Sequence, residues 1–273
     1  MFEKITEQPS LHDNLDQKSV HDLLYEMNEE DQKVALAVRE AIPQIESLVE
    51  QIVSRMRKGG RIFYLGAGTS GRLGVLDASE IPPTFGMPPT CVVGLIAGGE
   101  TALRNPVERA EDDPDKGWLE LQYRNVGPTD TVIGIAASGT TPYVIGALRH
   151  AREAGCLTAS ISCNPDSPVA HEAQIPIEVI VGPEFVTGST RLKSGTAQKL
   201  VLNMITTTTM IRLGRVQGNR MVNMQLSNSK LVDRGTRMLV EELGLEYGRA
   251  HQLLLLHGSV KKAADAYRQT HMV

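Results

Sequence analysis

The chain has 273 residues, a formal net charge of −4 and a hydrophobic share of 41%, but only 4% of its residues are aromatic. The acidic balance argues against a nucleic-acid surface, which needs a basic excess, and scarce aromatic side chains argue against stacking platforms for single strands. The N-terminus lacks the basic and then apolar pattern of a signal peptide, and no apolar run reaches membrane-spanning length. We therefore predict a cytoplasmic protein that binds neither nucleic acid nor membrane.

The three cysteines and seven histidines indicate neither a disulfide framework nor a metal site, because no pair has ligand spacing. The apolar strand patterns around Cys91 and Cys156 predict buried, reduced thiols. Cys163 lies in the turn-rich stretch SCNPDSP, where we expect a side chain near a loop and open to solvent.

The N-terminal part of the chain predicts an arm followed by helices. Residues 1–18 are polar and are expected to be extended. A helix with apolar residues at helical spacing begins at Ser19. Asn28 is positioned to cap a second helix over 29–59, which Pro43 either kinks or divides.

From residue 61 onward, short apolar strands alternate with helical patterns. The predicted strands span residues 61–65, 90–96, 131–136, 157–162 and 177–181, and the predicted helices span 71–79, 101–110, 115–124, 142–154, 167–173 and 194–213. This alternation implies an α/β fold with a parallel sheet covered on both faces by helices, that is, three layers with right-handed connections.

The pattern changes after about residue 215, where a helix is expected beyond Asn228 and two short helices are expected on either side of His257 and Gly258. We therefore predict an N-terminal arm with helices over 1–58, a ligand-binding core domain over 59–215 and a small helical appendage over 216–273.

Three strand–loop–helix units carry glycines and small hydroxyls at the point where the strand ends. The loops contribute Thr69 and Ser70; Ser138, Thr140 and Thr141; and Glu184, Ser189, Thr190 and Lys193. Glycine lets backbone N–H groups approach a ligand closely, and a helix N-terminus favours an anion. Because the carboxyl ends of parallel strands meet at one edge of a sheet, we predict that these loops form a phosphate site there. The simpler alternative is a set of helix caps with polar neighbours.

The first loop also fits the dinucleotide fingerprint G-x-G-x-x-G through Gly66, Gly68 and Gly71. That fingerprint requires an acidic residue at the end of the next strand, to bind a ribose. The next strand here ends in glycines, and Glu100 comes after it. A sugar phosphate is therefore the preferred ligand and a nucleotide the alternative.

The runs YLGAGTSGRLGVLDASEIPPTFG (64–86), GIAASGTTPYVIGAL (134–148) and GPEFVTGSTRLKSGTAQKLVLNM (182–204) resemble the N-acetylmuramic acid 6-phosphate etherase family. That family belongs to the sugar isomerase fold group and is related to the glucokinase regulatory protein. The resemblance covers almost the whole chain and implies that the predicted three-layer domain is of the sugar isomerase type. One departure is Arg109, which stands where the family usually has glycine.

The resemblance implies an activity. The ether between C3 of the sugar and D-lactate is cleaved, giving N-acetylglucosamine 6-phosphate and D-lactate. It further implies a homodimer that uses no metal or redox cofactor. Glu80 and Glu111 match the two catalytic glutamates of the family, the first as the acid and the second as the base that also activates water.

The chemistry is consistent with two carboxylates. An alkyl ether resists direct hydrolysis because alkoxide is a poor leaving group, but ring opening to the aldehyde acidifies the hydrogen on C2. A base removes it, an acid protonates the departing lactate oxygen, and water then adds at C3. Burial tunes carboxyl pKa values for such roles.

Each site residue also has a simpler interpretation. Glu80 closes a helix that Pro82 and Pro83 are expected to stop, and a glutamate at a helix end is usually solvated. Glu111 sits in an acidic cluster, which is commonly a wet surface. Lys193 is expected either to contact phosphate or to form a surface salt bridge, and Glu184 either to contact the sugar or to cap its turn.

Two other classes of protein remain as alternatives. A sugar-phosphate sensor would regulate a protein partner, and a transcriptional sensor would also need a DNA-reading helical domain, for which the acidic N-terminal helices are unsuited. An aldose–ketose isomerase on the same fold would share ring opening and a base near C2, but it would release no D-lactate.

Overall fold

A computed structural model describes residues 2–271. The chain divides into two compact units, one of residues up to 78 with 90–209 and one of 79–89 with the residues from 210 onward. Each unit is described by itself. Within the described part of the chain, no helix is long and apolar enough to span a bilayer.

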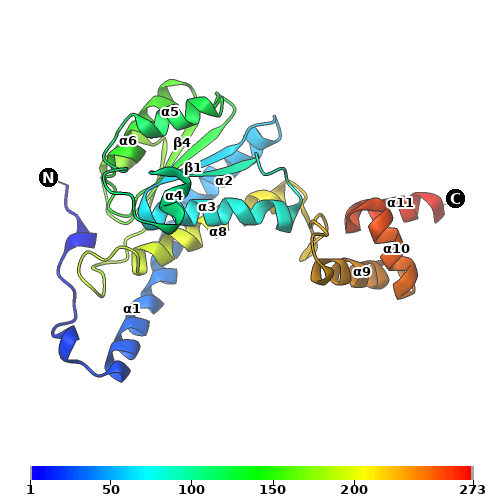
Figure 1. The fold of residues 1–273 in the computed structure, drawn as a ribbon, viewed down its shortest axis with the longest axis horizontal. Coiled ribbons are helices and arrows are strands. Elements are labelled where there is room, and N and C mark those ends of the chain that lie inside the picture. The colour runs from blue at the N-terminus through cyan, green and yellow to red at the C-terminus, as the bar shows by residue number, and fades with distance from the viewer. Residues whose placement is uncertain (1, 272–273) are drawn as a thin grey trace. The chain divides into compact units, whose positions relative to one another are not determined.

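The first unit is built on a five-stranded, fully parallel sheet. Its strands are β1 (Ile62–Gly66), β2 (Val92–Ile96), β3 (Thr131–Ile135), β4 (Leu157–Ser162) and β5 (Ile175–Glu178), in the spatial order β2-β1-β3-β4-β5. The connecting helices are α3 (Gly68–Phe85), α4 (Gly99–Arg104), α5 (Lys116–Tyr123), α6 (Pro142–Glu153), α7 (Pro168–Glu172) and α8 (Lys193–Arg212). Helices α5 and α6 cover one face of the sheet and α3 and α8 the other (Figure 1), which confirms the predicted three-layer α/β fold.

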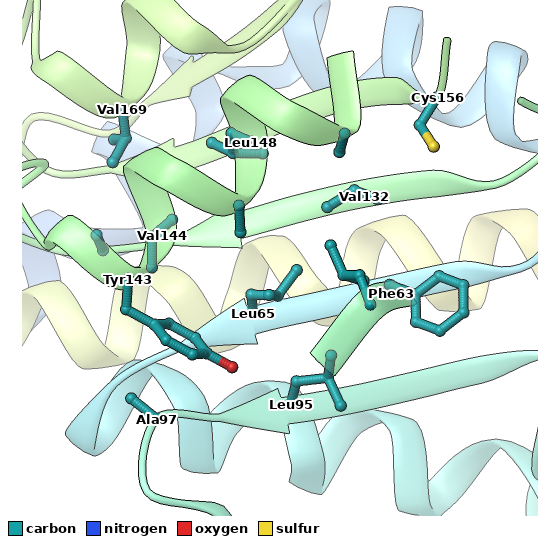
Figure 2. Packing of buried hydrophobic residues seen from close by; sticks show 14 residues of the cluster. Phe63, Leu65, Leu95, Ala97, Val132, Tyr143, Val144, Leu148, Cys156 and Val169 are labelled. Atoms are coloured by element: carbon teal, nitrogen blue, oxygen red, sulfur yellow. The ribbon is translucent and has the colours of Figure 1, made fainter. Parts of the chain in front are cut away.

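Alternation along β1 divides the core between the two faces. Phe63 and Leu65 are fully buried in a cluster with Val144 and Leu148 of α6 (Figure 2). Tyr64 points to the other face, where its hydroxyl donates to Asp77 of α3 at 3.2 Å. All five β1 residues are buried, as expected for a central strand of a parallel sheet.

The N-terminal helices begin where predicted but divide elsewhere. Ser19 caps α1 (Val20–Glu40) by accepting from the Asp22 N–H. The helix continues through Asn28, so the predicted cap there is wrong; Asn28 accepts a side-chain bond from Gln32 instead. The division occurs at Ala41, and α2 (Ile42–Met56) starts with proline in its first turn, where a missing N–H costs no intrahelical bond.

Two further expectations about helices were wrong. Helix α3 does not stop at Glu80 but runs to Phe85, with Pro82 and Pro83 inside it. Each proline removes one intrahelical donor, but the turn closes because Gly86 N–H donates to the Pro82 carbonyl at 2.9 Å. The predicted helix over 101–110 is the short α4, followed by an irregular segment in which Arg109 has a φ of 57°.

The second unit has its own core. A two-stranded hairpin, β6 (Val216–Gln217) and β7 (Arg220–Met221), precedes three helices, α9 (Ser229–Leu243), α10 (Tyr247–His257) and α11 (Val260–His271). Asn228 caps α9 and Gly258 closes α10, in agreement with the predicted helical appendage. Leu239, Leu254 and Ala263 are fully buried in this unit's own cluster.

Candidate active site

The strand order places two of the predicted loops at the switch point of the sheet. From β1 the chain passes through α3 to β2 on one side, and from β3 it passes through α6 to β4 on the other. The carboxyl ends of β1 and β3 therefore flank a topological switch, where open α/β sheets bind their ligands. The loop that follows β3 carries Ser138, Thr140 and Thr141, whereas Thr69 and Ser70, which were expected in the loop after β1, lie in the first turn of α3.

The loop between β3 and α6 is a compact hydroxyl cluster. The Ser138 hydroxyl oxygen accepts from the Thr140 hydroxyl at 3.1 Å and from the Thr140 N–H at 3.3 Å. Since Ser138 accepts in both bonds, neither uses its own proton. Thr141 stands at the N-cap of α6 without a side-chain capping bond. All three side chains are partly exposed, so the loop stays a candidate for contact with the ligand.

Backbone constraints hold this loop in place. Gly139 has a φ of 73°, and an added Cβ there would lie 2.3 Å from Ser167 Cβ. Only glycine fits such a close approach with a positive φ. The Gly139 carbonyl accepts from the Val169 N–H at 3.1 Å, which joins the loop to the start of α7.

The first turn of α3 packs on the first turns of α8. Ser70 is buried, and its hydroxyl donates to the Gln198 carboxamide oxygen at 2.9 Å. The Thr69 methyl lies 3.4 Å from the position of a Cβ on Gly195. Helix α8 therefore holds the Ser70 hydroxyl by a hydrogen bond and lies close to the Thr69 methyl group.

Glu184 is fully buried and serves the N-terminus of α8. Its carboxylate accepts from the backbone N–H groups of Lys193 and Ser194, both at 2.9 Å, and from the Ser194 hydroxyl at 2.7 Å. A carboxylate favours the positive end of a helix. Glu184 thus caps the start of α8, which is the structural alternative considered for it, and its contact with the sugar stays a prediction.

Lys193 forms a buried ion pair rather than a surface one. Its ammonium lies 2.6 Å from Glu30 of α1, and the two residues are 1% and 4% exposed. Burial disfavours the charged form of Glu30, but hydrogen bonds from Lys193, Lys33 and His12 outweigh that effect and lower the Glu30 pKa to about 2. Contact of this ammonium with a phosphate stays a prediction.

Ser189 and Thr190 form the turn that leads into α8. The Ser189 carbonyl accepts from the Leu192 N–H, and the Thr190 carbonyl accepts from the Gly195 N–H at 3.0 Å. Their side chains are partly exposed, and Gly188 before them has a φ of 72°. This turn stays a candidate for contact with the ligand.

Glu111 lies in the first unit beside the start of α6. Its carbonyl accepts from the Tyr143 N–H at 3.0 Å, which fixes its backbone two residues from Thr141. Its side chain is exposed. The backbone of Glu111 is thus joined to the first turn of α6, which follows the loop of Ser138.

Glu80 lies in the second unit, within residues 79–89. It occupies α3 three residues after Asp77, and its side chain is exposed. Its partnership with Glu111 therefore stays a prediction.

Three structural contributors were missed by the sequence analysis. Glu30 pairs with Lys193, Asn164 binds the Ser138 carbonyl at 2.9 Å, and Gln198 binds Ser70. Gln198 lies inside the run 182–204, and Asn164 lies two residues after the end of β4, so both positions carried a local signal. Glu30 lies in a helix far away in the sequence, where no local pattern marked it.

The expectation for Cys163 was wrong. It is fully buried, and its thiol lies 3.9 Å from the Ser194 carbonyl. Burial raises its pKa to about 12, so the thiol is inert. Cys91 and Cys156 are buried as predicted. Among residues 2–271, no group of three or more His, Cys, Asp and Glu side chains is arranged to hold a metal ion.

Comparison with known proteins defines the class of this fold. Residues 44–152 match the glucokinase regulatory protein N-terminal SIS domain, and residues 116–208 match the SIS domain. A putative sugar-phosphate isomerase from Listeria monocytogenes superimposes with a TM-score of 0.55 at 17% identity, over 74% of this chain and 94% of that one. A phosphoheptose isomerase from Neisseria gonorrhoeae gives 0.52 at 14% identity, over 72% of this chain and 100% of that one. The fold is that of a sugar isomerase domain.

Sequence relatives define the family more narrowly. A Bacteroides fragilis protein named N-acetylmuramic acid 6-phosphate etherase is 72% identical over 267 residues, which are 98% of this chain and 95% of that protein. Relatives of the same name from Porphyromonas gingivalis and Christiangramia forsetii are 69% and 58% identical, over 98% and 96% of this chain and the same shares of their own lengths. The chain belongs to the N-acetylmuramic acid 6-phosphate etherase family.

Proposed function

We propose that this protein cleaves the D-lactyl ether of N-acetylmuramic acid 6-phosphate and releases N-acetylglucosamine 6-phosphate and D-lactate. The observation that carries the proposal is the hydroxyl cluster of Ser138, Thr140 and Thr141 at the switch point of the sheet, in a chain of this family. The activity makes the protein a carbon–oxygen lyase that acts in amino sugar catabolism and recycling of cell-wall sugars.

The proposed route is elimination followed by addition of water. With the sugar open, Glu111 removes the proton from C2, and Glu80 gives a proton to the lactate oxygen as the C3–O bond breaks. After it has released that proton to solvent, Glu111 takes a proton from the water that adds to C3 of the unsaturated aldehyde and gives it to C2, while Glu80 regains a proton from solvent. Both roles are proton transfers, each worth about 10²–10⁴-fold in rate. The sequence of steps has no net oxidation and requires no redox cofactor.

The 6-phosphate is proposed to bind at the hydroxyl loops. Ser138 donates its free proton, and Thr140 and Thr141 complete the contact from the same loop. Thr69, Ser70, Ser189 and Thr190 contact the phosphate or the sugar. Glu184 and Lys193 support this site by stabilising the N-terminus of α8. Direct contact of either side chain with the substrate would add to that role.

Assembly and location follow from the same proposal. We infer a homodimer in which α1 contributes to the interface, because Val20 and Leu24 lie one turn apart and are 73% and 62% exposed. The substrate is a small phosphorylated sugar, so the protein is expected in the cytoplasm. We expect no nucleic-acid partner, because the net negative charge of the chain repels the phosphate backbone.

One experiment tests the proposal against its alternatives. The protein is incubated with N-acetylmuramic acid 6-phosphate in ¹⁸O-labelled water, D-lactate is assayed, and the sugar product is analysed by mass spectrometry. Release of D-lactate with the label on the C3 oxygen is expected. Binding without release of D-lactate would overturn the proposal in favour of a sugar-phosphate sensor. Conversion of an aldose phosphate to a ketose without D-lactate would favour an isomerase.

A further inference from the structure

The N-terminal segment is joined to the predicted phosphate loop by a buried amide. Thr6 and Asn164 are both fully buried although 158 residues separate them. The Thr6 N–H donates to the Asn164 carboxamide oxygen at 3.0 Å, and the Asn164 NH₂ donates back to the Thr6 hydroxyl at 2.9 Å. Two reciprocal bonds fix both the position and the rotamer of the Asn164 side chain.

The same carboxamide holds the hydroxyl loop. The Asn164 NH₂ also donates to the Ser138 carbonyl at 2.9 Å. Each of its two protons thus has an acceptor, one on the N-terminal segment and one on the loop. The Ser138 carbonyl belongs to the peptide that leads into Gly139, the residue with positive φ. Holding this carbonyl therefore fixes the Ser138–Gly139 peptide, which lies between the Cα that carries the Ser138 hydroxyl and the glycine that precedes the Thr140 N–H.

A second attachment joins the segment to the turn before α8. The Ser10 hydroxyl donates to the Phe185 carbonyl at 2.8 Å, and the Ser10 N–H donates to the Thr187 hydroxyl at 2.9 Å. Between these points, Glu7 lies near Gly188, with a carboxylate oxygen 3.1 Å from the position of a Cβ there. The segment from Thr6 to Ser10 therefore contacts the loop before α8 directly and is joined to the Ser138 loop through Asn164.

We propose that Thr6 and Asn164 are positioning residues for substrate binding, which hold the Ser138 loop in the geometry that receives the 6-phosphate. The proposal rests on the proposed function, since it assigns a ligand to that loop. Neither side chain touches the substrate. Loss of the Thr6 hydroxyl leaves a buried N–H proton of Asn164 without its acceptor, so the carboxamide turns toward other acceptors and releases the Ser138 carbonyl.

The test compares Thr6→Val with Thr6→Ser. Valine keeps the shape and the backbone N–H but lacks the hydroxyl acceptor, and serine keeps the acceptor. We expect Thr6→Val to raise the KM for N-acetylmuramic acid 6-phosphate about tenfold with kcat little changed, the signature of lost substrate binding. Thr6→Ser should restore the wild-type KM. Asn164→Asp, which keeps the acceptor for Thr6 N–H but lacks both amide protons, should raise KM as Thr6→Val does.

A matched control separates positioning from general stability. Thr158 is another fully buried threonine, near the start of β4, and its hydroxyl bonds Gln174 rather than a ligand loop. Thr158→Val should lower the thermal midpoint as Thr6→Val does and leave KM unchanged. In a double-mutant cycle, Thr6→Val should raise KM much less in the Ser138→Ala background than in the wild type.

The outcomes distinguish this inference from the proposed function. Calorimetric titration with N-acetylglucosamine 6-phosphate gives binding independently of turnover. A wild-type protein that neither binds this sugar nor releases D-lactate defeats the proposed function. Suppose instead that the wild type binds the sugar and releases D-lactate. An unchanged KM for Thr6→Val, or a rise in KM for Thr158→Val equal to that for Thr6→Val, would then defeat only the positioning role.

Discussion

The two loops that follow β3 and β5 use their polar groups in opposite ways. Around the start of α8, two charged side chains are already bound within the protein, since Glu184 caps the helix and Lys193 pairs with Glu30 in the interior. In the loop before α6, the polar side chains are small, neutral and partly exposed, and the Ser138 proton is not used by the two bonds that its hydroxyl accepts. We propose that the first arrangement stabilises the fold and that the second receives the ligand.

The difference shows why charge alone is a poor guide to a phosphate site. A buried lysine beside a carboxylate is already neutralised, and removing it leaves an uncompensated charge. Hydroxyl and backbone donors bind a phosphate without that dependence, and they stay in place when the ligand leaves. We therefore propose that Lys193 and Glu184 stabilise the structure, that the Ser138 loop binds the phosphate, and that Glu80 and Glu111 transfer protons.

The largest change in rate is expected from replacing the two proposed catalytic carboxylates, which belong to neither loop. Glu80→Gln and Glu111→Gln should each lower kcat by about 10²–10⁴-fold, because each removes one proton transfer. Binding of N-acetylglucosamine 6-phosphate should stay close to wild type, as measured by calorimetry. Loss of binding in parallel with activity would mark the residue as structural and would reopen the assignment of roles.

The next effect tests the arrangement around the start of α8. Lys193→Met should lower the free energy of unfolding by about 3–5 kcal/mol, because Glu30 would keep a buried charge without its main partner. Chemical denaturation at neutral pH measures this. The paired variant Ser138→Ala should unfold like the wild type and bind the phosphorylated sugar about tenfold more weakly. Reversal of these two results, with Lys193→Met stable and unable to bind, would place the phosphate on the lysine.

A third effect tests the Ser138 loop through the ligand. N-acetylmuramic acid without the 6-phosphate should be cleaved with a kcat/KM lower by about 100-fold or more, since several hydrogen bonds to a charged group are lost. D-lactate release from both substrates gives the ratio. Equal turnover would contradict the assignment of phosphate to these loops.

The smallest effect concerns the partly buried carboxyl of Asp77, which accepts hydrogen bonds from two hydroxyl groups. Burial raises the Asp77 pKa to about 6 from 3.8, against the opposing hydrogen bonds from Thr206 and Tyr64. The folded state therefore binds this proton more tightly than the unfolded state, and stability increases as pH falls from about 6 toward 3.8. Asp77→Asn should raise the free energy of unfolding at pH 8 by about 1 kcal/mol and flatten this part of the pH profile. An unchanged profile would remove Asp77 as its source.

Local patterns were sufficient for most of the fold. The alternation of apolar strands with helices predicted the parallel sheet, and capping residues such as Ser19 and Asn228 predicted helix starts, because both signals depend on neighbours in sequence. The same local rules stopped α3 at Glu80 too early, since Pro82 and Pro83 are accommodated within a longer helix.

The contacts that define the candidate site depend on distant residues. Glu30 meets Lys193 across 163 positions, and Thr6 meets Asn164 across 158. A lysine in a glycine-rich turn is equally consistent with a phosphate ligand or an ion pair until its partner is located. The hydroxyl side chains could be proposed as ligand contacts from sequence because several of them follow the ends of predicted strands. The partner of Lys193 could be identified only in the folded chain.

The central claim is that neutral hydroxyls at the switch point bind the 6-phosphate. Calorimetric titration of N-acetylglucosamine 6-phosphate and of N-acetylglucosamine into the wild type and Ser138→Ala tests it most directly. We expect the wild type to bind the phosphorylated sugar at least about 100-fold more tightly than the unphosphorylated one. Ser138→Ala should lower the affinity for the phosphorylated sugar about tenfold and leave the affinity for the other sugar unchanged. Equal affinity of the wild type for both sugars, or no effect of Ser138→Ala, would contradict it.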